Sequence, residues 1–157
     1  MNKKIKIGLL IIGIGILLGG GIFLYMFFQP HRDVQSAKTD FQLEAKQIVD
    51  EYLKDSSIAN NKYLQEEGDS KIIEVSGIVA EITEDFNQQK VVLLKGMDEP
   101  AGVSCTFTSE TNKNANKLKI GDRVIIKGVI RSGAGYDKDM ELYEDVIMEK
   151  CDLVKSK

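Results

Sequence analysis

The sequence predicts a mainly β domain: a small closed barrel of five strands, preceded by an amphipathic helix and an N-terminal membrane-spanning helix. Three observations support this fold class. Residues 7–28 are 22 consecutive uncharged residues. From residue 71 onward, five short stretches show the apolar alternation or short apolar runs that are typical of β-strands. Two of these stretches carry a glycine near their middle, as do strands that bend into a barrel.

The charge balance limits the classes of partner. Three lysines are the only charged residues before position 30, and the remainder carries 18 Lys and Arg against 24 Asp and Glu, a net charge of −6. Proteins that bind phosphate backbones usually present a basic surface, because the release of counterions drives that binding. The sequence therefore argues against nucleic acid as a partner.

The stretch from Ile7 to Phe28 predicts a membrane anchor within an N-terminal segment of residues 1–29. As a helix it is roughly 33 Å long, which matches a hydrocarbon core of about 30 Å. The alternative is a cleaved signal peptide, whose apolar stretch has about 7–15 residues and ends at a small-x-small site. Here the stretch is longer and ends in Phe-Phe-Gln-Pro. We therefore expect an uncleaved anchor that attaches the protein to the membrane through residues 7–28.

The lysines around the anchor predict its orientation. Lys3, Lys4 and Lys6 precede the apolar stretch, and only Arg32 follows it directly. Positive residues next to a span stay on the cytoplasmic side. We therefore expect a single-pass protein of the bacterial inner (cytoplasmic) membrane, with its N-terminus in the cytoplasm and its C-terminal domain outside it.

A polar tether over residues 30–40 and a helical segment over residues 41–67 are expected next. Within residues 41–55, apolar residues recur at helical spacing, at Ala45, Ile48, Val49, Tyr52 and Leu53. The opposite face carries as many acids as bases, so we expect the helix to pack on the following domain. The alternative is a helix that lies on the membrane surface. Ser56 and Ser57 are suited to cap a second short helix.

Residues 68–157 predict the barrel. The expected strands are Lys71–Glu84, Lys90–Gly96, Gly102–Thr108, Arg123–Ser132 and Asp145–Lys155. Gly77 and Gly128 interrupt the long first and fourth strands, and the polar connector Thr111–Leu118 can hold a short helix. Long strands that bend at a glycine and close a short sheet are the plan of an OB-fold.

Several segments resemble one family of such domains. GVSCTF, GDRVIIKG and DVIMEKCDLV resemble the tRNA_anti-like family, and PHRDV, NNKYL and IEVSGIV extend the resemblance upstream in the same order. The resemblance implies an OB-fold related distantly to the anticodon-binding domain of tRNA synthetases, in membrane-anchored proteins of Bacteroidetes-type bacteria. It implies no catalytic residues. The chain departs from the family pattern in a longer loop between Gly133 and Asp145.

Candidate ligand-binding residues lie where OB-folds usually bind. The loop after the first strand and the loop between the fourth and fifth strands flank the ligand groove of an OB-fold. Phe86 and Tyr136 lie in these loops and can stack on a base or sugar, and Arg131 lies near the end of the fourth strand. The alternative is that Phe86 closes the end of the barrel and Tyr136 shields it.

The two cysteines, Cys105 and Cys151, lie on the expected third and fifth strands, which are neighbours in an OB-fold. Outside the cytoplasm a disulfide between them is chemically permitted. The alternative is two small apolar core residues. We expect no metal at this pair, because the only histidine, His31, lies beside the anchor.

An acidic loop near the C-terminus resembles the start of a calcium site. Asp137, Asp139 and Glu141 alternate there, but Leu142 stands where a calcium loop needs glycine. We expect a solvated acidic loop without metal.

No catalytic cluster and no phosphate-binding glycine loop is present in the sequence. We therefore expect no enzyme and no cofactor, but a binding or assembly module at the cell envelope whose partner is a protein, peptide or glycan. The alternative is an OB domain that binds tRNA or single-stranded nucleic acid.

Overall fold

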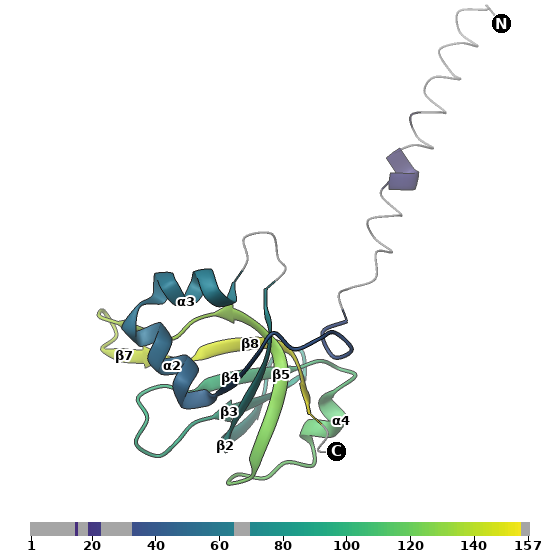
Figure 1. Ribbon diagram of the computed structural model, residues 1–157. Coiled ribbons are helices and arrows are strands. Elements are labelled where there is room, and N and C mark those ends of the chain that lie inside the picture. Colours follow the sequence, from purple (N-terminus) through teal and green to yellow (C-terminus); the bar gives the residue numbers. More distant parts are fainter. Residues whose placement is uncertain (1–14, 16–18, 23–32, 65–69, 155–157) are drawn as a thin grey trace, which may run out of the picture. The chain divides into compact units, whose positions relative to one another are not determined.

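The computed structural model describes residues 15, 19–22, 33–64 and 70–154, and the chain divides into two units, Met1–Asp33 and Val34–Lys157. In the first unit, Gly15 and residues 19–22 are helical. The rest of the expected anchor, Ile7–Phe28, lies outside the described residues. Within the described part of the chain, no helix combines the length and the apolar character needed to cross a membrane. The second unit contains the barrel (Figure 1).

The barrel closes through five strands. They are β2 (Ile72–Glu84), β3 (Lys90–Leu94), β4 (Val103–Phe107), β5 (Arg123–Ser132) and β8 (Val146–Leu153). Each pairs with the next in the order β2-β3-β4-β8-β5, and a further pairing of β2 with β5 closes the sheet. Only the β4–β8 pairing within this ring is parallel. This confirms the expected five-stranded barrel with the plan of an OB-fold.

Two glycines allow the long strands to serve two neighbours. The first half of β2 pairs with β5 and its second half with β3, and Gly77 lies just before this change. A Cβ at Gly77 would stand 3.0 Å from the Cβ of Leu94 and 3.2 Å from that of Ala45. At Gly128 the register of β5 against β8 shifts, and a Cβ there would lie 2.8 Å from the Cys151 sulfur. Both positions therefore need glycine for close packing.

The inward-facing residues of the strands form one apolar core. They follow the period of two that the sequence shows. Among the described residues, the buried side chains that carry a polar group are the tyrosines Tyr52 and Tyr63 and the cysteines Cys105 and Cys151. The largest buried side chains of the barrel strands are Ile72, Ile73, Leu94, Phe107, Ile126, Ile130 and Met148.

Residues Phe41–Glu44, expected as the start of a helix, form strand β1 instead. β1 pairs in parallel with residues 73–76 of β2, on the edge that β3 leaves unpaired. Phe41 and Leu43 alternate with polar residues, so the segment fits a strand as well as a helix. The free edge decides between them, because it offers backbone hydrogen bonds. Phe41 then packs edge-on against Tyr63, with ring centroids 5.4 Å apart.

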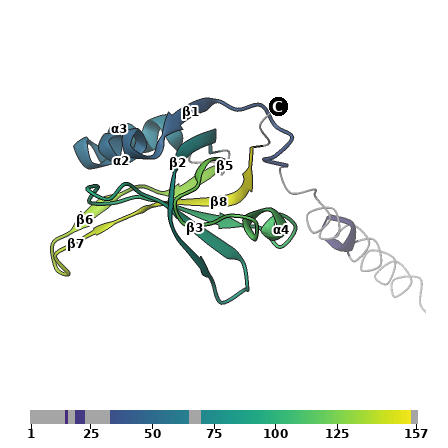
Figure 2. The ribbon, with the colours of Figure 1, turned by 90° about the horizontal axis from the view of Figure 1, so that it is seen from below.

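Two helices follow, α2 (Ala45–Lys54) and α3 (Ser56–Tyr63), and lie side by side on one side of the barrel (Figures 1 and 2). The expected apolar stripe of α2 is buried at Ala45, Ile48, Val49 and Tyr52, as expected for a helix that packs on the barrel. The cap of α3 is Asp55, whose carboxylate accepts the N–H of Ile58 at 3.0 Å. The expectation of a serine cap was wrong.

The segment expected as a tether packs on the barrel from Val34 onward. Val34 is buried. The Gln35 side-chain amide donates to the carbonyl of Lys150 at 2.7 Å, and the Lys127 ammonium donates to the carbonyl of Gln35 at 3.1 Å. These contacts fasten the start of the second unit to β5 and β8.

Three short elements complete the unit. Helix α4 (Asn112–Ala115) occupies the polar connector, as expected. Strands β6 (Gly135–Asp137) and β7 (Leu142–Glu144) form a separate hairpin where the sequence predicted a loop. The Asp137 carboxylate accepts the N–H groups of Asp139 at 2.8 Å and Met140 at 3.0 Å, which closes the turn. α4 and the hairpin lie at opposite ends of the barrel (Figure 2).

Candidate binding face of the barrel

The outer face of β3 and β4 is the surface that OB-folds commonly use for ligands. Val92 and Leu94 of β3 and Cys105 and Phe107 of β4 are buried, so the residues between them face outward. These outward residues are Val91, Leu93, Ser104 and Thr106. The register pairs Val91 with Thr106 and Leu93 with Ser104, which makes two short rows across the strands. All four are half-buried.

The rows continue onto the neighbouring strands. Ile147 of β8 lies beside Ser104, and Glu81 of β2 lies beside Leu93. The central rows thus carry apolar and hydroxyl side chains, with a carboxylate at the margin and neither a cation nor an aromatic ring. Phosphates attract cations, and unstacked bases bind on aromatic rings. The central rows offer neither kind of contact.

Phe86 lies in the turn between β2 and β3, and its side chain is fully exposed. The Asp85 carboxylate holds this turn by accepting the N–H groups of Asn87 and Gln89, both at 2.8 Å. The turn is also fixed to α4, because the Asn112 side-chain amide donates to the Gln88 carbonyl at 2.8 Å. The Phe86 ring therefore does not close the end of the barrel.

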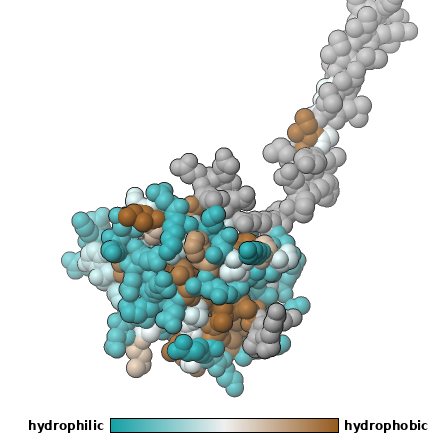
Figure 3. Space-filling view, in the orientation of Figure 1, coloured by the Kyte–Doolittle hydropathy of each residue, from teal (hydrophilic) through white to brown (hydrophobic). Residues whose placement is uncertain are grey.

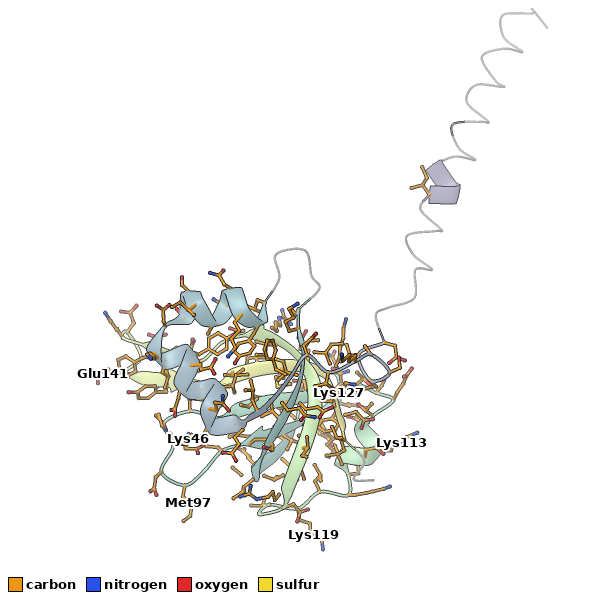
Figure 4. All side chains as sticks on the ribbon, in the orientation of Figure 1. Lys46, Met97, Lys113, Lys119, Lys127 and Glu141 are labelled. Atoms are coloured by element: carbon orange, nitrogen blue, oxygen red, sulfur yellow. The ribbon has the colours of Figure 1, made fainter. Side chains whose placement is uncertain are left out.

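Tyr136 lies on the hairpin at the other end of the barrel. Its ring packs on Tyr143 of β7, with centroids 4.9 Å apart, and both rings remain about half exposed. Figure 4 shows Lys113 of α4 and Glu141 of the hairpin on opposite sides of the molecule. Phe86 and Tyr136 therefore lie at opposite ends of the candidate face and are not brought together.

The base of the hairpin is held by helix α2 and by the loop before β4. The Tyr52 ring covers Gly133 so closely that a Cβ at Gly133 would lie 2.0 Å from two of its carbons. On the other side, the N–H of Gly102 donates to the Asp145 carboxylate at 2.7 Å. The position of the hairpin thus depends on the packing of α2.

Arg131 is an exposed residue near the end of β5 and makes an ion pair with Glu149 of β8. The hydrogen bond from the guanidinium to Glu149 raises the pKa of Arg131. The Arg131 guanidinium is therefore already bound by a carboxylate of the same chain. A ligand-binding role for Phe86, Arg131 and Tyr136 stays a prediction.

Comparison with known proteins places the chain in a family. Residues 1–147 match tRNA_anti-like. The chain belongs to the tRNA_anti-like family. No curated protein matches it. Among solved structures, it is similar to a lipoprotein of Klebsiella pneumoniae subsp. pneumoniae MGH 78578 whose name proposes nucleic-acid binding. The two structures superpose with a TM-score of 0.54 at 16% sequence identity, and the match covers 81% of this chain and 100% of the Klebsiella protein. At this identity, the similarity shows a shared fold.

A second solved structure is an OBody bound to hen egg-white lysozyme, with a TM-score of 0.38 and 18% identity. That match covers 55% of this chain and 84% of the other.

The cysteines of this tRNA_anti-like protein lie inside the barrel. Cys105 and Cys151 are both buried and both free thiols. Burial raises the pKa of Cys151, and contact with the Cys105 thiol raises it further. Such a thiol is neutral near pH 7 and is a poor nucleophile. In this structure the two cysteines are not bonded to each other and lie in the core, as in the alternative.

A polar cluster joins the two helices of the tRNA_anti-like protein. The Glu51 carboxylate accepts hydrogen bonds from the Lys62 ammonium at 2.8 Å and the Tyr63 hydroxyl at 2.7 Å. Burial opposes the charge of Glu51, but these hydrogen bonds outweigh it and lower the pKa of the carboxyl. Nearby, the buried Tyr52 hydroxyl has no hydrogen-bond partner among the described residues, and burial raises the pKa of Tyr52 to about 12. The cluster holds α3 on α2.

Within the described ranges, no group of three or more histidine, cysteine or acidic residues could hold a metal ion. The side of the domain shown in Figure 3 is mostly hydrophilic with separate apolar patches. On the barrel, a groove of about 300 Å³ is lined by Gln42, Glu74, Ser76 and Ile125 among others. The Gln42 amide already donates to Glu74 there, at 2.8 Å.

The central rows of the β3–β4 face were not singled out by the sequence. The run KVVLL is apolar throughout, so it does not reveal which residues point outward. The alternation in GVSCTF assigns Ser104 and Thr106 to the outside, and pairing with β3 would have extended the face to Leu93.

Proposed function

We propose that this protein is a non-catalytic binding module held at the cell envelope, and that the outer face of β3 and β4 binds a polypeptide. One observation carries the proposal. The central rows of that face, built from Val91, Leu93, Ser104 and Thr106, are uncharged and half-buried.

The chemistry of the face favours protein over other ligands. The centre of a protein interface is depleted in charged residues and relies on apolar contact with a few hydrogen bonds. The side chains of Val91 and Leu93 provide the apolar contact, and the hydroxyls of Ser104 and Thr106 provide donors and acceptors. Glycans and bases bind best on aromatic rings, which these rows lack. Phe86 lies at one end of the face, where its exposed ring would meet the flank of a larger partner.

The envelope location rests on the sequence and on the fold relative. The 22 uncharged residues from Ile7 to Phe28 are long enough to span a membrane. The Klebsiella protein with the same fold is a lipoprotein. We propose a single-pass anchor in the inner membrane, with the N-terminus in the cytoplasm and the barrel outside it.

The proposal of a non-catalytic role rests on the groups that face the ligand. The four central side chains do not titrate near pH 7 and include no nucleophile with an adjacent base. Both thiols of the chain are buried inside the barrel and do not face the ligand.

A photo-crosslinking amino acid tests the proposal. It replaces Ser104 in the full-length chain, which is irradiated in the membranes of its own cells and then purified. The control places the same group at Ile58, which is 66% exposed on α3. We expect an adduct at position 104 that resists nuclease and contains peptides of a second protein, identified by mass spectrometry, and no adduct at position 58. An absent adduct at 104, or equal adducts at both positions, would contradict the proposal.

The second candidate is binding of nucleic acid. It is favoured by the name of the Klebsiella protein and by the exposed Phe86 ring, which can stack on a base. The net charge of −6 after the anchor opposes it. A nuclease-sensitive adduct at position 104 would contradict binding of a polypeptide and would support binding of nucleic acid.

A further inference from the structure

The hairpin of β6 and β7 presents an exposed apolar surface with acidic residues around it. We call residues 135–145 the acidic hairpin. They contain five acids and one lysine. Glu141 and Glu144 are exposed, whereas Asp137 and Asp145 are used in hydrogen bonds within the chain. The large apolar side chains exposed there, each by more than two fifths, are Tyr136, Met140, Leu142 and Tyr143.

The turn before β5 presents the opposite charge. We call residues 113–123 the basic turn. They contain three lysines, one arginine and one acid. The acid, Asp122, accepts the backbone N–H of Lys119 at 2.9 Å. Ile120 is 71% exposed at the tip. The cations, all exposed, are Lys113, Lys117, Lys119 and Arg123.

The basic turn is fixed to the barrel and not left as a loose loop. The N–H of Gly121 donates to the carbonyl of Val79 at 2.8 Å, and the N–H of Val79 donates to the carbonyl of Asp122 at 2.9 Å. Gly121 has a φ of +94°, which suits glycine and shapes the turn. The Ile120 side chain is therefore held in a fixed, exposed position at the tip of the basic turn.

The two surfaces lie at opposite ends of one strand. The basic turn leads into β5 and the acidic hairpin follows it, so the ten residues of β5 separate them, roughly 33 Å of strand. Figure 4 shows Lys119 and Glu141 on different sides of the molecule. One copy of the chain cannot join its own two surfaces, but two copies can.

We propose that copies of this chain associate head to tail, with the acidic hairpin of one copy on the basic turn of the next. The second copy is the favoured occupant because its exposed surface supplies both the opposite charge and an apolar tip. Charge complementarity orients such a contact, and apolar residues at its centre supply most of its affinity. Because the two surfaces differ, the contact is heterologous and can repeat into rings or rows. It is independent of the ligand on the β3–β4 face.

Cysteine crosslinking of the full-length chain in membranes tests this arrangement. Met140→Cys and Ile120→Cys are made in separate, differently tagged chains, co-expressed and treated with a short bifunctional maleimide. Cys105 and Cys151 are fully buried, so the unchanged chain gives the background. We expect a mixed dimer from the two variants together, no dimer from either variant alone, and a ladder of oligomers from a chain with both changes.

A charge exchange separates a specific contact from random collision. Glu141→Lys in the Met140→Cys chain should lower the mixed dimer about tenfold, which corresponds to about 1.4 kcal/mol. Lys119→Glu in the Ile120→Cys chain should then restore it. Glu84→Lys, a reversal of charge at the far end of β2, is the matched control and should leave the dimer unchanged.

Three results would overturn the proposal: no mixed dimer, dimers of Met140→Cys chains alone in equal yield, or a charge exchange that fails to restore crosslinking. Crosslinking of the hairpin to a different protein in place of a second copy would overturn it as well. The adduct at Ser104 does not depend on these outcomes, so the two proposals fail separately.

Discussion

Substitution of Gly133 by alanine should loosen helix α2 from the barrel. The Tyr52 ring covers this glycine, and a Cβ there would lie 2.0 Å from the Cδ1 and Cε1 carbons of the ring. Carbon atoms in favourable contact are about 3.5–4.0 Å apart, so the ring or the backbone must move by about 1.5 Å or more. Because Tyr52 is buried in the core, this movement disturbs the contacts that hold α2 and the base of the hairpin.

The size of the effect lies between two limits. Overpacking of a core typically costs about 1–3 kcal/mol, and complete loss of a buried aromatic side chain about 3–5 kcal/mol. We expect Gly133→Ala to lower the free energy of unfolding by about 3 kcal/mol. A domain of ordinary stability remains folded after such a loss.

Urea unfolding of the full chain in detergent, followed by tyrosine fluorescence and circular dichroism, measures this change. Gly135→Ala is the matched control two residues away, because a Cβ there would meet only a Glu144 carboxylate oxygen, at 3.6 Å. The control should change the stability by less than about 1 kcal/mol. In a Tyr52→Ala background, Gly133→Ala should cost almost nothing, since the clashing ring is gone.

The reasoning would be refuted if Gly133→Ala were as mild as Gly135→Ala. It would also be refuted if the full cost of Gly133→Ala persisted without the Tyr52 ring, because the loss would then come from the backbone and not from this contact.

Three other predictions follow from the structure. The pKa of Tyr52 is about 12 in the folded chain against 10.0 for a free tyrosine, so the stability that this residue contributes is complete below pH 10 and falls as the pH rises to 12. In urea unfolding, Tyr52→Phe should therefore lose less stability at alkaline pH than the unchanged chain, and an equal loss in both would contradict this. Cys105 and Cys151 should resist maleimide in the folded chain and react after unfolding, whereas reaction only after added reductant would reveal a disulfide. The full chain should stay in the membrane pellet at pH 11 through Ile7–Phe28, and its release into the supernatant would refute the anchor.

The sequence predicted the barrel because its strands carry clear local signals. The alternating segment GVSCTF contains strand β4 in the structure, and Gly128 lies at a shift in the register of β5 against β8. Phe41–Glu44 was predicted wrongly because its residues suit both a helix and a strand. The choice between them depends on an edge of β2 that is distant in the sequence. The hairpin escaped prediction since its strands have three residues each, too few to show a period.

The candidate site was predicted only in part. Phe86 and Tyr136 follow from the positions of loops in an OB-fold, and the structure places both at the surface. Their separation at opposite ends of the barrel depends on strand lengths and register, which local patterns do not contain. The pairing of Arg131 with Glu149 likewise depends on the register of β5 against β8.

The central claim is that the uncharged central rows of the β3–β4 face, and not charge attraction, select the ligand. The yield of the Ser104 adduct as a function of salt concentration tests this most directly. We expect a nearly constant yield between about 50 and 200 mM salt, because apolar and hydroxyl contacts release few counterions. Binding through several phosphate contacts would weaken by about 10³–10⁵ over the same range, and a collapse of the adduct would contradict the account.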